Sequence, residues 1–107
     1  MANSTIKNTP TISSQFYRGF ASEDNISINA NTDFVRNISV PTVDGYTPFG
    51  VIGIQLSNAT SNGSNVSYVA YRTNLLFTDR VQVAGRNFGS SAAKIKIMTY
   101  ILYIKAE

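Results

Sequence analysis

The 107-residue chain contains no cysteine, no histidine and no tryptophan. Without cysteine there is no disulfide framework, no thiolate metal ligand and no cysteine nucleophile. Without histidine the usual base at neutral pH is missing, and so are the Ser-His-Asp triad and nearly all zinc sites. The composition therefore excludes much of enzyme chemistry, and we expect neither a metal ion nor another cofactor.

Good helix formers and charged residues are also scarce. Glutamate occurs twice, lysine four times, and charged residues make up only 14% of the chain. Isoleucine, valine and threonine together supply 29 residues, and such β-branched side chains suit the pleated surface of a sheet. Serine, threonine and asparagine supply 33, which favours turns and polar loops. With 43% apolar residues, the chain is predicted to form one all-β domain around a single core.

The charge and hydropathy patterns argue against nucleic acid and against membrane insertion. The net charge is +3, but the nine cations are spread along the chain, whereas nucleic-acid binders gather them on one face or in one run. The longest strongly apolar run, Ile97–Ile104, is far too short to cross a bilayer. Met1–Pro10 is polar and lacks a signal peptide, so we expect synthesis in the cytoplasm and release only by lysis or within a particle.

Turn signals divide the chain every 8 to 12 residues or so, which is typical of sandwiches and jelly rolls. They include Asp44-Gly45, the polar loop Ser57–Asn65, a loop over Gly85–Ser91, a solvated turn at Glu23-Asp24-Asn25 and a bend at Asn74. We therefore predict a single antiparallel β-sandwich, jelly-roll-like, with seven or eight strands. Residues 1–10 are expected to form a flexible N-terminal connector and residues 11–107 the sandwich domain.

The last segment, Ala92–Lys105, is predicted to be one long strand. One parity carries Ile95, Ile97, Ile101 and Tyr103, and the other parity ends in Tyr100, Leu102 and Ile104. A strand that is apolar on both sides belongs in the centre of a sheet or at a subunit interface.

A polar-aromatic patch is the candidate binding site. Tyr71 and Arg72, together with Asp79 and Arg80, are suited to sugar recognition, because tyrosine rings stack on sugars while Arg and Asp fix hydroxyl groups. Tyr68 and Tyr71 have opposite parity, so one of them is expected in the core. The alternative is that Tyr71 packs in a sandwich layer or between subunits.

No catalytic residues are predicted. Asp33 and Asp79 would have to face each other to form a hydrolytic carboxylate pair, and no spacing supports that arrangement. Glu23-Asp24-Asn25 lacks the alternating spacing of a calcium loop. We therefore expect a protein that is not an enzyme and holds no metal.

Three stretches together resemble a known family. They are Ile26–Thr32 (ISINANT), Gly45–Ile54 (GYTPFGVIGI), and Arg86–Ile97 (RNFGSSAAKIKI) leading into Ile101–Lys105 (ILYIK). In this order they resemble the C-terminal head domains of tail-fibre and minor structural proteins in phages and prophages of Gram-positive gut bacteria.

The resemblance implies a β-sandwich head on a trimeric fibre that contacts the host surface. The expected function is therefore a non-enzymatic, tail-associated structural domain that binds a host-surface glycan. Its expected partners are two further copies of itself, as a homotrimer, and a cell-wall glycan of a Gram-positive host. The alternatives are a free carbohydrate-binding or lectin-like module and a purely structural virion component.

Overall fold

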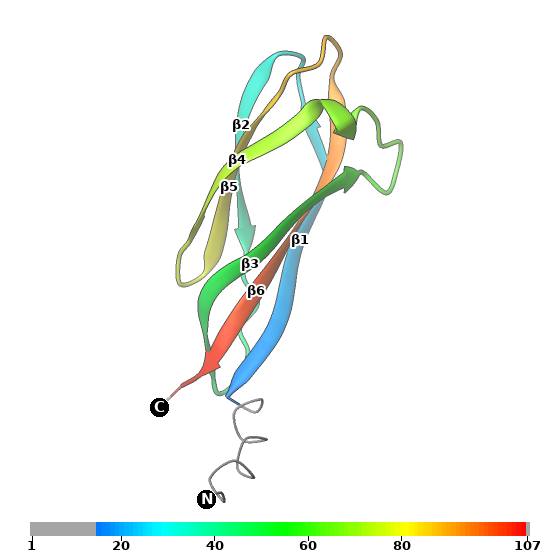
Figure 1. Ribbon diagram of the computed structural model, residues 1–107. Coiled ribbons are helices and arrows are strands. Elements are labelled where there is room, and N and C mark those ends of the chain that lie inside the picture. The colour runs from blue at the N-terminus through cyan, green and yellow to red at the C-terminus, as the bar shows by residue number, and fades with distance from the viewer. Residues whose placement is uncertain (1–14, 107) are drawn as a thin grey trace, which may run out of the picture.

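Residues 15–106 are described by a computed structural model and form two three-stranded antiparallel sheets packed as a sandwich (Figure 1). The first sheet has the strand order β1-β6-β3 and the second has the order β2-β5-β4. The elements are β1 (Phe16–Ile28), β2 (Thr32–Ser39), β3 (Tyr46–Asn58), the 3₁₀ turn η2 (Val66–Tyr68), β4 (Val69–Leu76), β5 (Arg80–Asn87) and β6 (Ala93–Lys105). The predicted all-β antiparallel sandwich is confirmed. The predicted connector over residues 1–10 lies outside the described residues.

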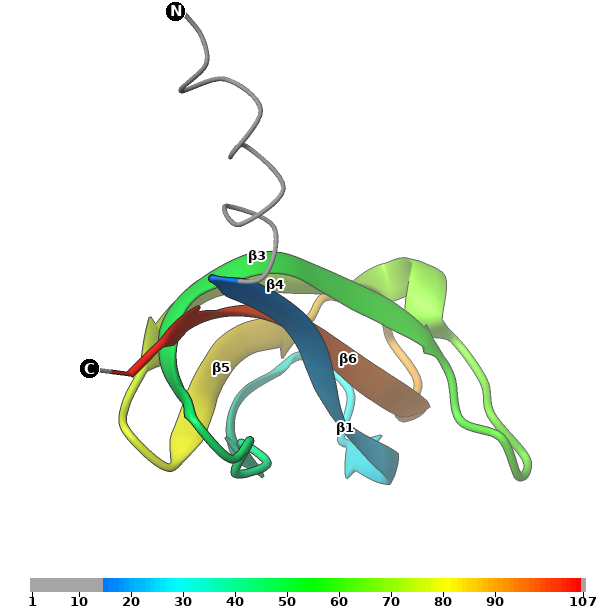
Figure 2. The ribbon, with the colours of Figure 1, turned by 90° about the horizontal axis from the view of Figure 1, so that it is seen from below.

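No helix in the described range is long and apolar enough to cross a membrane. The strands are instead long: β1, β3 and β6 have 13 residues each, which corresponds to about 43 Å. Seen from below, the strands of both sheets curve and twist (Figure 2).

The described part of the chain contains six strands, so the prediction of seven or eight was wrong. Glu23-Asp24-Asn25 is not a turn but a bulge inside β1, where the register shifts between Glu23 and Ile26. Asn25 adopts a left-handed conformation with φ 57°, and its N–H donates to the Asp24 carboxylate at 2.8 Å. Asn74 likewise does not bend the chain, because it lies within β4 and pairs with Val83 of β5. Asparagine tolerates both the left-handed and the extended conformation, so it does not by itself mark the end of a strand. This is why the predicted number of strands was too high.

The predicted loop over Gly85–Ser91 begins too early, because β5 continues to Asn87. A Cβ atom on Gly85 would lie 2.3 Å from the Ala70 carbonyl oxygen and 2.8 Å from the Phe34 ring. This glycine therefore permits a close approach between strands and does not mark a turn. The Asp44-Gly45 turn is confirmed, with Gly45 at φ 82°.

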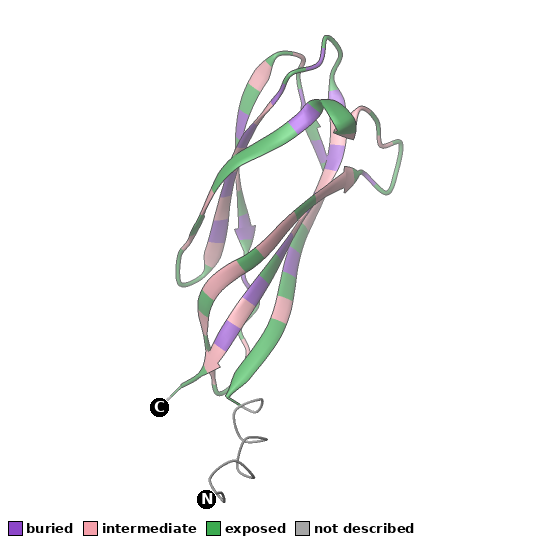
Figure 3. Ribbon diagram, viewed as in Figure 1, coloured by how far each residue is buried: buried purple, intermediate pink, exposed green. Residues whose placement is uncertain are grey.

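The core forms where the inner faces of β6 and β5 meet. Ile95, Ile97, Ile101 and Tyr103 are completely buried, as their parity predicts, and β6 lies at the centre of its sheet. Figure 3 shows this alternation along the strands. The buried hydrophobic cluster comprises Ala21, Ile26, Ile28, Phe34, Ile38, Val40, Val69, Val81, Val83, Ala93, Ile95, Ile97, Ile101 and Tyr103.

An ion pair links the two sheets. The Arg36 guanidinium of β2 donates two hydrogen bonds to the Glu23 carboxylate of β1. One joins Arg36 Nε to Glu23 Oε1 at 3.2 Å, and the other joins Arg36 Nη2 to Glu23 Oε2. Both side chains are half-buried, and a bidentate pair of this kind fixes orientation as well as adding energy. The pair therefore contributes to the alignment of β1 with β2.

The sandwich is long and has two ends (Figure 1). At the proximal end, as we call it, β1 begins and β6 finishes. The distal end carries the β1–β2 turn, the loop of residues 59–65 and the β5–β6 loop.

Tyr103 is the largest fully buried side chain near the proximal end. Its hydroxyl donates a 2.7 Å hydrogen bond to the Pro41 carbonyl oxygen, and its ring packs edge-on to Tyr17 with centroids 5.7 Å apart. Burial, and secondarily the nearby Tyr17, raises the pKa of Tyr103 above its ordinary value of 10.0. This tyrosine therefore ties the β2–β3 loop to the core.

We expect Tyr103→Phe to lower the free energy of unfolding by about 1 kcal/mol at neutral pH, through loss of the bond to Pro41. Since the folded-state pKa is raised, the unfolded chain ionises first, and the stabilisation present below pH 10 is lost as pH rises through the folded-state value. Denaturant titrations at neutral pH and above pH 10 measure both effects. Tyr68→Phe is the exposed control. An alkaline loss of stability that is as large in Tyr103→Phe as in the unmodified chain would contradict this assignment.

Candidate functional site

Three segments that are far apart in sequence meet at the distal end. The Asn31 N–H donates to the Gly89 carbonyl oxygen at 3.1 Å, which joins the β1–β2 turn to the β5–β6 loop. The Phe88 N–H donates to the Tyr68 carbonyl oxygen at 2.9 Å, which adds η2 to the same assembly. The distal end is thus a connected surface.

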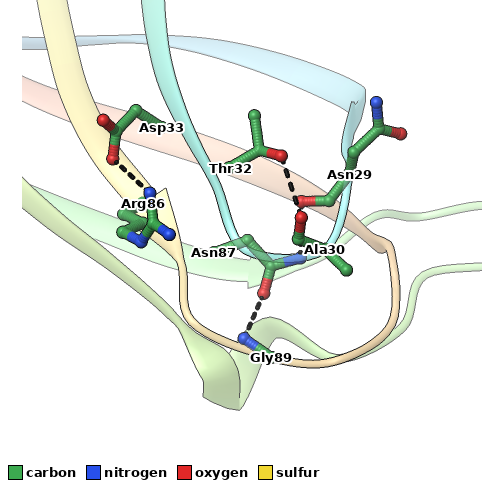
Figure 4. A network of polar contacts seen from close by, with 7 residues as sticks. All are labelled: Asn29, Ala30, Thr32, Asp33, Arg86, Asn87 and Gly89. Atoms are coloured by element: carbon green, nitrogen blue, oxygen red, sulfur yellow. Dashed lines mark hydrogen bonds and ion pairs between the residues drawn. The ribbon is translucent and has the colours of Figure 1, made fainter.

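Asn87 organises this surface from beneath (Figure 4). It is completely buried, and its amide nitrogen lies 3.0–3.2 Å from the carbonyl oxygens of Ile28, Asn29 and Ser91. Its amide oxygen accepts the Gly89 N–H at 2.9 Å. One asparagine side chain therefore satisfies backbone groups from both distal connections, as buried polar groups require.

The loop of residues 59–65 is also fixed by side chains. The Asp24 carboxylate accepts the Thr60 N–H at 3.1 Å. Hydrogen bonding from the Thr60 side chain, and then from this N–H, lowers the pKa of Asp24 below its ordinary value. The Asn58 amide oxygen accepts the Val66 N–H at 3.1 Å, and the Asn65 amide donates to the Ala92 carbonyl oxygen at 2.9 Å. This loop is thereby joined to β1 and to the β5–β6 loop.

An exposed aromatic ring with two arginines close to it lies at the same end. Phe88 is 56% exposed, and the guanidinium carbons of Arg72 and Arg86 lie 5.8 and 5.7 Å from its ring centroid. Arg86 also pairs with the exposed Asp33 at 3.0 Å, whereas Arg72 has no ion pair among residues 15–106. An aromatic surface beside cations and a carboxylate can stack a sugar ring and pair with an acidic substituent. We call Arg72, Arg86, Phe88 and Asp33 the distal cluster.

Only part of the predicted polar-aromatic patch lies at the distal cluster. Arg72 belongs to the distal cluster, and Tyr71 is 41% exposed at a register shift in β4, opposite Gly85. Asp79 and Arg80 lie at the β4–β5 turn instead, five residues from Gly85 along β5, or about 17 Å. The four predicted residues therefore do not form one site.

Asp79 and Arg80 form a separate small cluster. Their side chains pair at 3.0 Å, and the Arg80 guanidinium lies 4.1 Å from the centroid of Phe77. This turn thus repeats the chemistry of the distal cluster at the other end of the same sheet.

The prediction that Tyr68 or Tyr71 lies in the core was wrong. Tyr68 is 57% exposed, because it belongs to η2 and not to a strand, so strand parity does not apply to it. The sequence analysis also missed Phe88, Arg86 and Asp33 as site residues. The segment from Arg86 to Gly89 was predicted only as part of a loop, and no spacing in the sequence places Arg72 beside it.

The two aspartates considered for hydrolysis lie far apart. Asp33 pairs with Arg86 in the register of β2 and β5, while Asp79 precedes Arg80, six residues away along β5. This corresponds to about 20 Å, beyond the separation of about 10 Å or less that glycosidase carboxylates need. Within residues 15–106 there is also no group of three or more acidic side chains placed to hold a metal ion.

No protein-family model matches the chain, and no curated protein or solved structure matches it either.

We expect Asn87→Asp to lower the free energy of unfolding by about 3 kcal/mol. Aspartate has the same shape, but it replaces the buried donor nitrogen by an oxygen that faces three carbonyl oxygens. Chemical denaturation measures the loss. The control is Asn37→Asp, on the exposed side of β2, for which a change within about 0.5 kcal/mol is expected. Equal effects of the two substitutions would show that the Asn87 network does not stabilise the distal end.

Proposed function

We propose that this chain is a non-enzymatic, tail-associated domain of a phage or prophage that binds an acidic cell-wall glycan of a Gram-positive host through its distal cluster. The observation that carries the proposal is the exposed Phe88 ring beside Arg72 and Arg86, in a loop that Asn87 ties to the β1–β2 turn. The cluster lies at the distal end of the sandwich, opposite to the start of β1 and the end of β6 (Figure 1). A domain joined to a particle at its proximal end would present this surface outward.

The ligand class follows from the charges. The distal cluster holds two guanidinium groups and one carboxylate, and the chain carries a net charge of +3. A glycan with carboxylate or phosphate groups would pair with Arg72, which has no ion pair among the described residues, while a sugar ring stacks on Phe88. Such binding weakens as salt rises.

The fold is compatible with the family resemblance. A jelly roll pairs its first strand with its last and its second with the one before the last, in two facing sheets. Here β1 pairs with β6 and β2 with β5, so we regard the sandwich as a reduced jelly roll. The homotrimer implied by the resemblance belongs to the same proposal, as does release with the particle at lysis.

Retention of the full chain on purified Gram-positive cell walls tests the proposal. We expect Arg72→Gln and Phe88→Ala each to weaken retention about tenfold or more, because each removes a central contact. Walls stripped of teichoic acid and walls stripped of acidic polysaccharide distinguish a phosphate ligand from a carboxylate ligand.

Arg80→Gln is the matched control, since Arg80 also lies over a phenylalanine ring beside an aspartate, at the β4–β5 turn. Its retention should equal that of the unmodified chain. Loss of retention in Arg80→Gln alone would move the site to the β4–β5 turn. Absence of retention on every Gram-positive wall would refute glycan binding and leave a purely structural role.

A further inference from the structure

The proximal half of the outer face of the β1-β6-β3 sheet is largely apolar although it faces solvent. Five large apolar side chains on or beside it are 37–65% exposed. We call them, together with three half-buried neighbours on β6, the apolar face: Phe16, Phe20, Phe49, Ile52, Tyr100, and the neighbours Met98, Leu102 and Ile104.

The strand register places these residues together. Phe16 pairs with Ile104 and Phe20 with Tyr100 across β1 and β6, and the rings of Phe20 and Tyr100 lie 6.4 Å apart. Paired residues of adjacent strands point to the same side of a sheet, so the even-numbered positions of β6 share this face.

β3 contributes two protruding residues and a hollow. Phe49 and Ile52 are the extra residues of its two bulges, at the register shifts before Gly50 and Gly53. A hollow of about 480 Å³, with an apolar lining except for one arginine, lies beside them. Its lining residues are Arg18, Gly19, Phe20, Ile52, Gly53 and Tyr100. The same face thus presents both a projecting aromatic ring and a recess that can accept one.

The exposed apolar area is large enough to form the centre of an interface. A large side chain presents about 150–250 Å², so five that are about half exposed present about 500 Å² of apolar surface. This is at the upper end for a free monomer, and it is more than half of the ~800 Å² that each partner buries in a stable complex. The opposite sheet differs, because its exposed Val35 and Leu75 stand among polar and charged neighbours.

We infer that the apolar face is the contact surface between copies of this chain, with the projecting bulge residues of one copy seated in the hollow of the next. The apolar face lies in the proximal half of the sheet, whereas Lys94, Lys96 and their partners Ser27 and Ser57 make the distal half polar. Copies joined in this way leave the distal loops free. The inference names the surface for the self-association in the proposed function and does not depend on glycan binding.

Sedimentation velocity of the full chain over a range of concentrations tests this inference. We expect the unmodified chain to form one defined oligomer, and Phe20→Asp or Ile52→Asp to weaken association about thirtyfold or more, the effect of a central contact residue. Val35→Asp and Leu75→Asp, on equally exposed side chains of the other sheet, are the matched controls and should assemble normally. The inference is overturned if the unmodified chain stays monomeric at high concentration or if only the controls dissociate.

Thiol labelling gives a second readout that does not need the charged variants to fold. The chain has no cysteine, so a single introduced cysteine is the only thiol. Phe20→Cys should become protected from a thiol reagent as the concentration rises, while Val35→Cys stays reactive. Equal reactivity at all concentrations counts against the interface, and so does binding of a monomeric chain to phosphatidylcholine vesicles. A variant that is folded but monomeric should also be retained more weakly on cell walls, because it binds through one distal cluster and loses avidity. Such a result does not count against glycan binding.

Discussion

The fold depends on β6, because this strand carries apolar side chains on both faces. Burial of both faces needs a packing layer on each side of the sheet. Its inner parity supplies the completely buried Ile95, Ile97, Ile101 and Tyr103, and the second sheet covers them with Val81 and Val83. Both edges of β6 are paired, with β1 and β3, so the strand contributes no free edge. Its outer parity, however, has no second layer within the described chain. The composition that supports the core of one sandwich therefore also leaves an exposed apolar face, which is the surface that we propose for self-association.

The distal end is governed by a different constraint, which is the satisfaction of backbone groups where strands change sheets. β1 passes to β2, and β5 to β6, so two crossovers lie side by side and their carbonyl groups would be left unpaired. The buried amide of Asn87 forms hydrogen bonds with carbonyl groups of both connections, which requires this polar side chain to be buried. Rigidity at the loops follows from this network, and with it the fixed positions of Phe88 and Arg86 on the surface above.

How much of this could be predicted from the sequence depends on the range of the interaction. The parity of β6 and the Asp44-Gly45 turn follow from local pattern, and they were predicted correctly. Asparagine was the main source of error, since Asn25 lies in a bulge and Asn74 in a strand, although both resemble turn residues. The distal cluster could not be predicted, because Arg72 meets Phe88 only through the pairing of β4 with β5 and through η2. No spacing along the chain encodes that pairing.

In the arrangement that we propose, assembly and recognition would use two separate surfaces of one small domain. Apolar contact is not directional, so the apolar face needs only shape and area, and the bulges of β3 provide shape without interrupting the sheet. Recognition of a charged sugar needs fixed positions, and these come from the Asn87 network on short, tied loops. Because the strands are about 43 Å long, burial of one surface does not cover the other. The length of the strands, more than any single residue, would therefore allow the proposed oligomer to present several distal clusters at once.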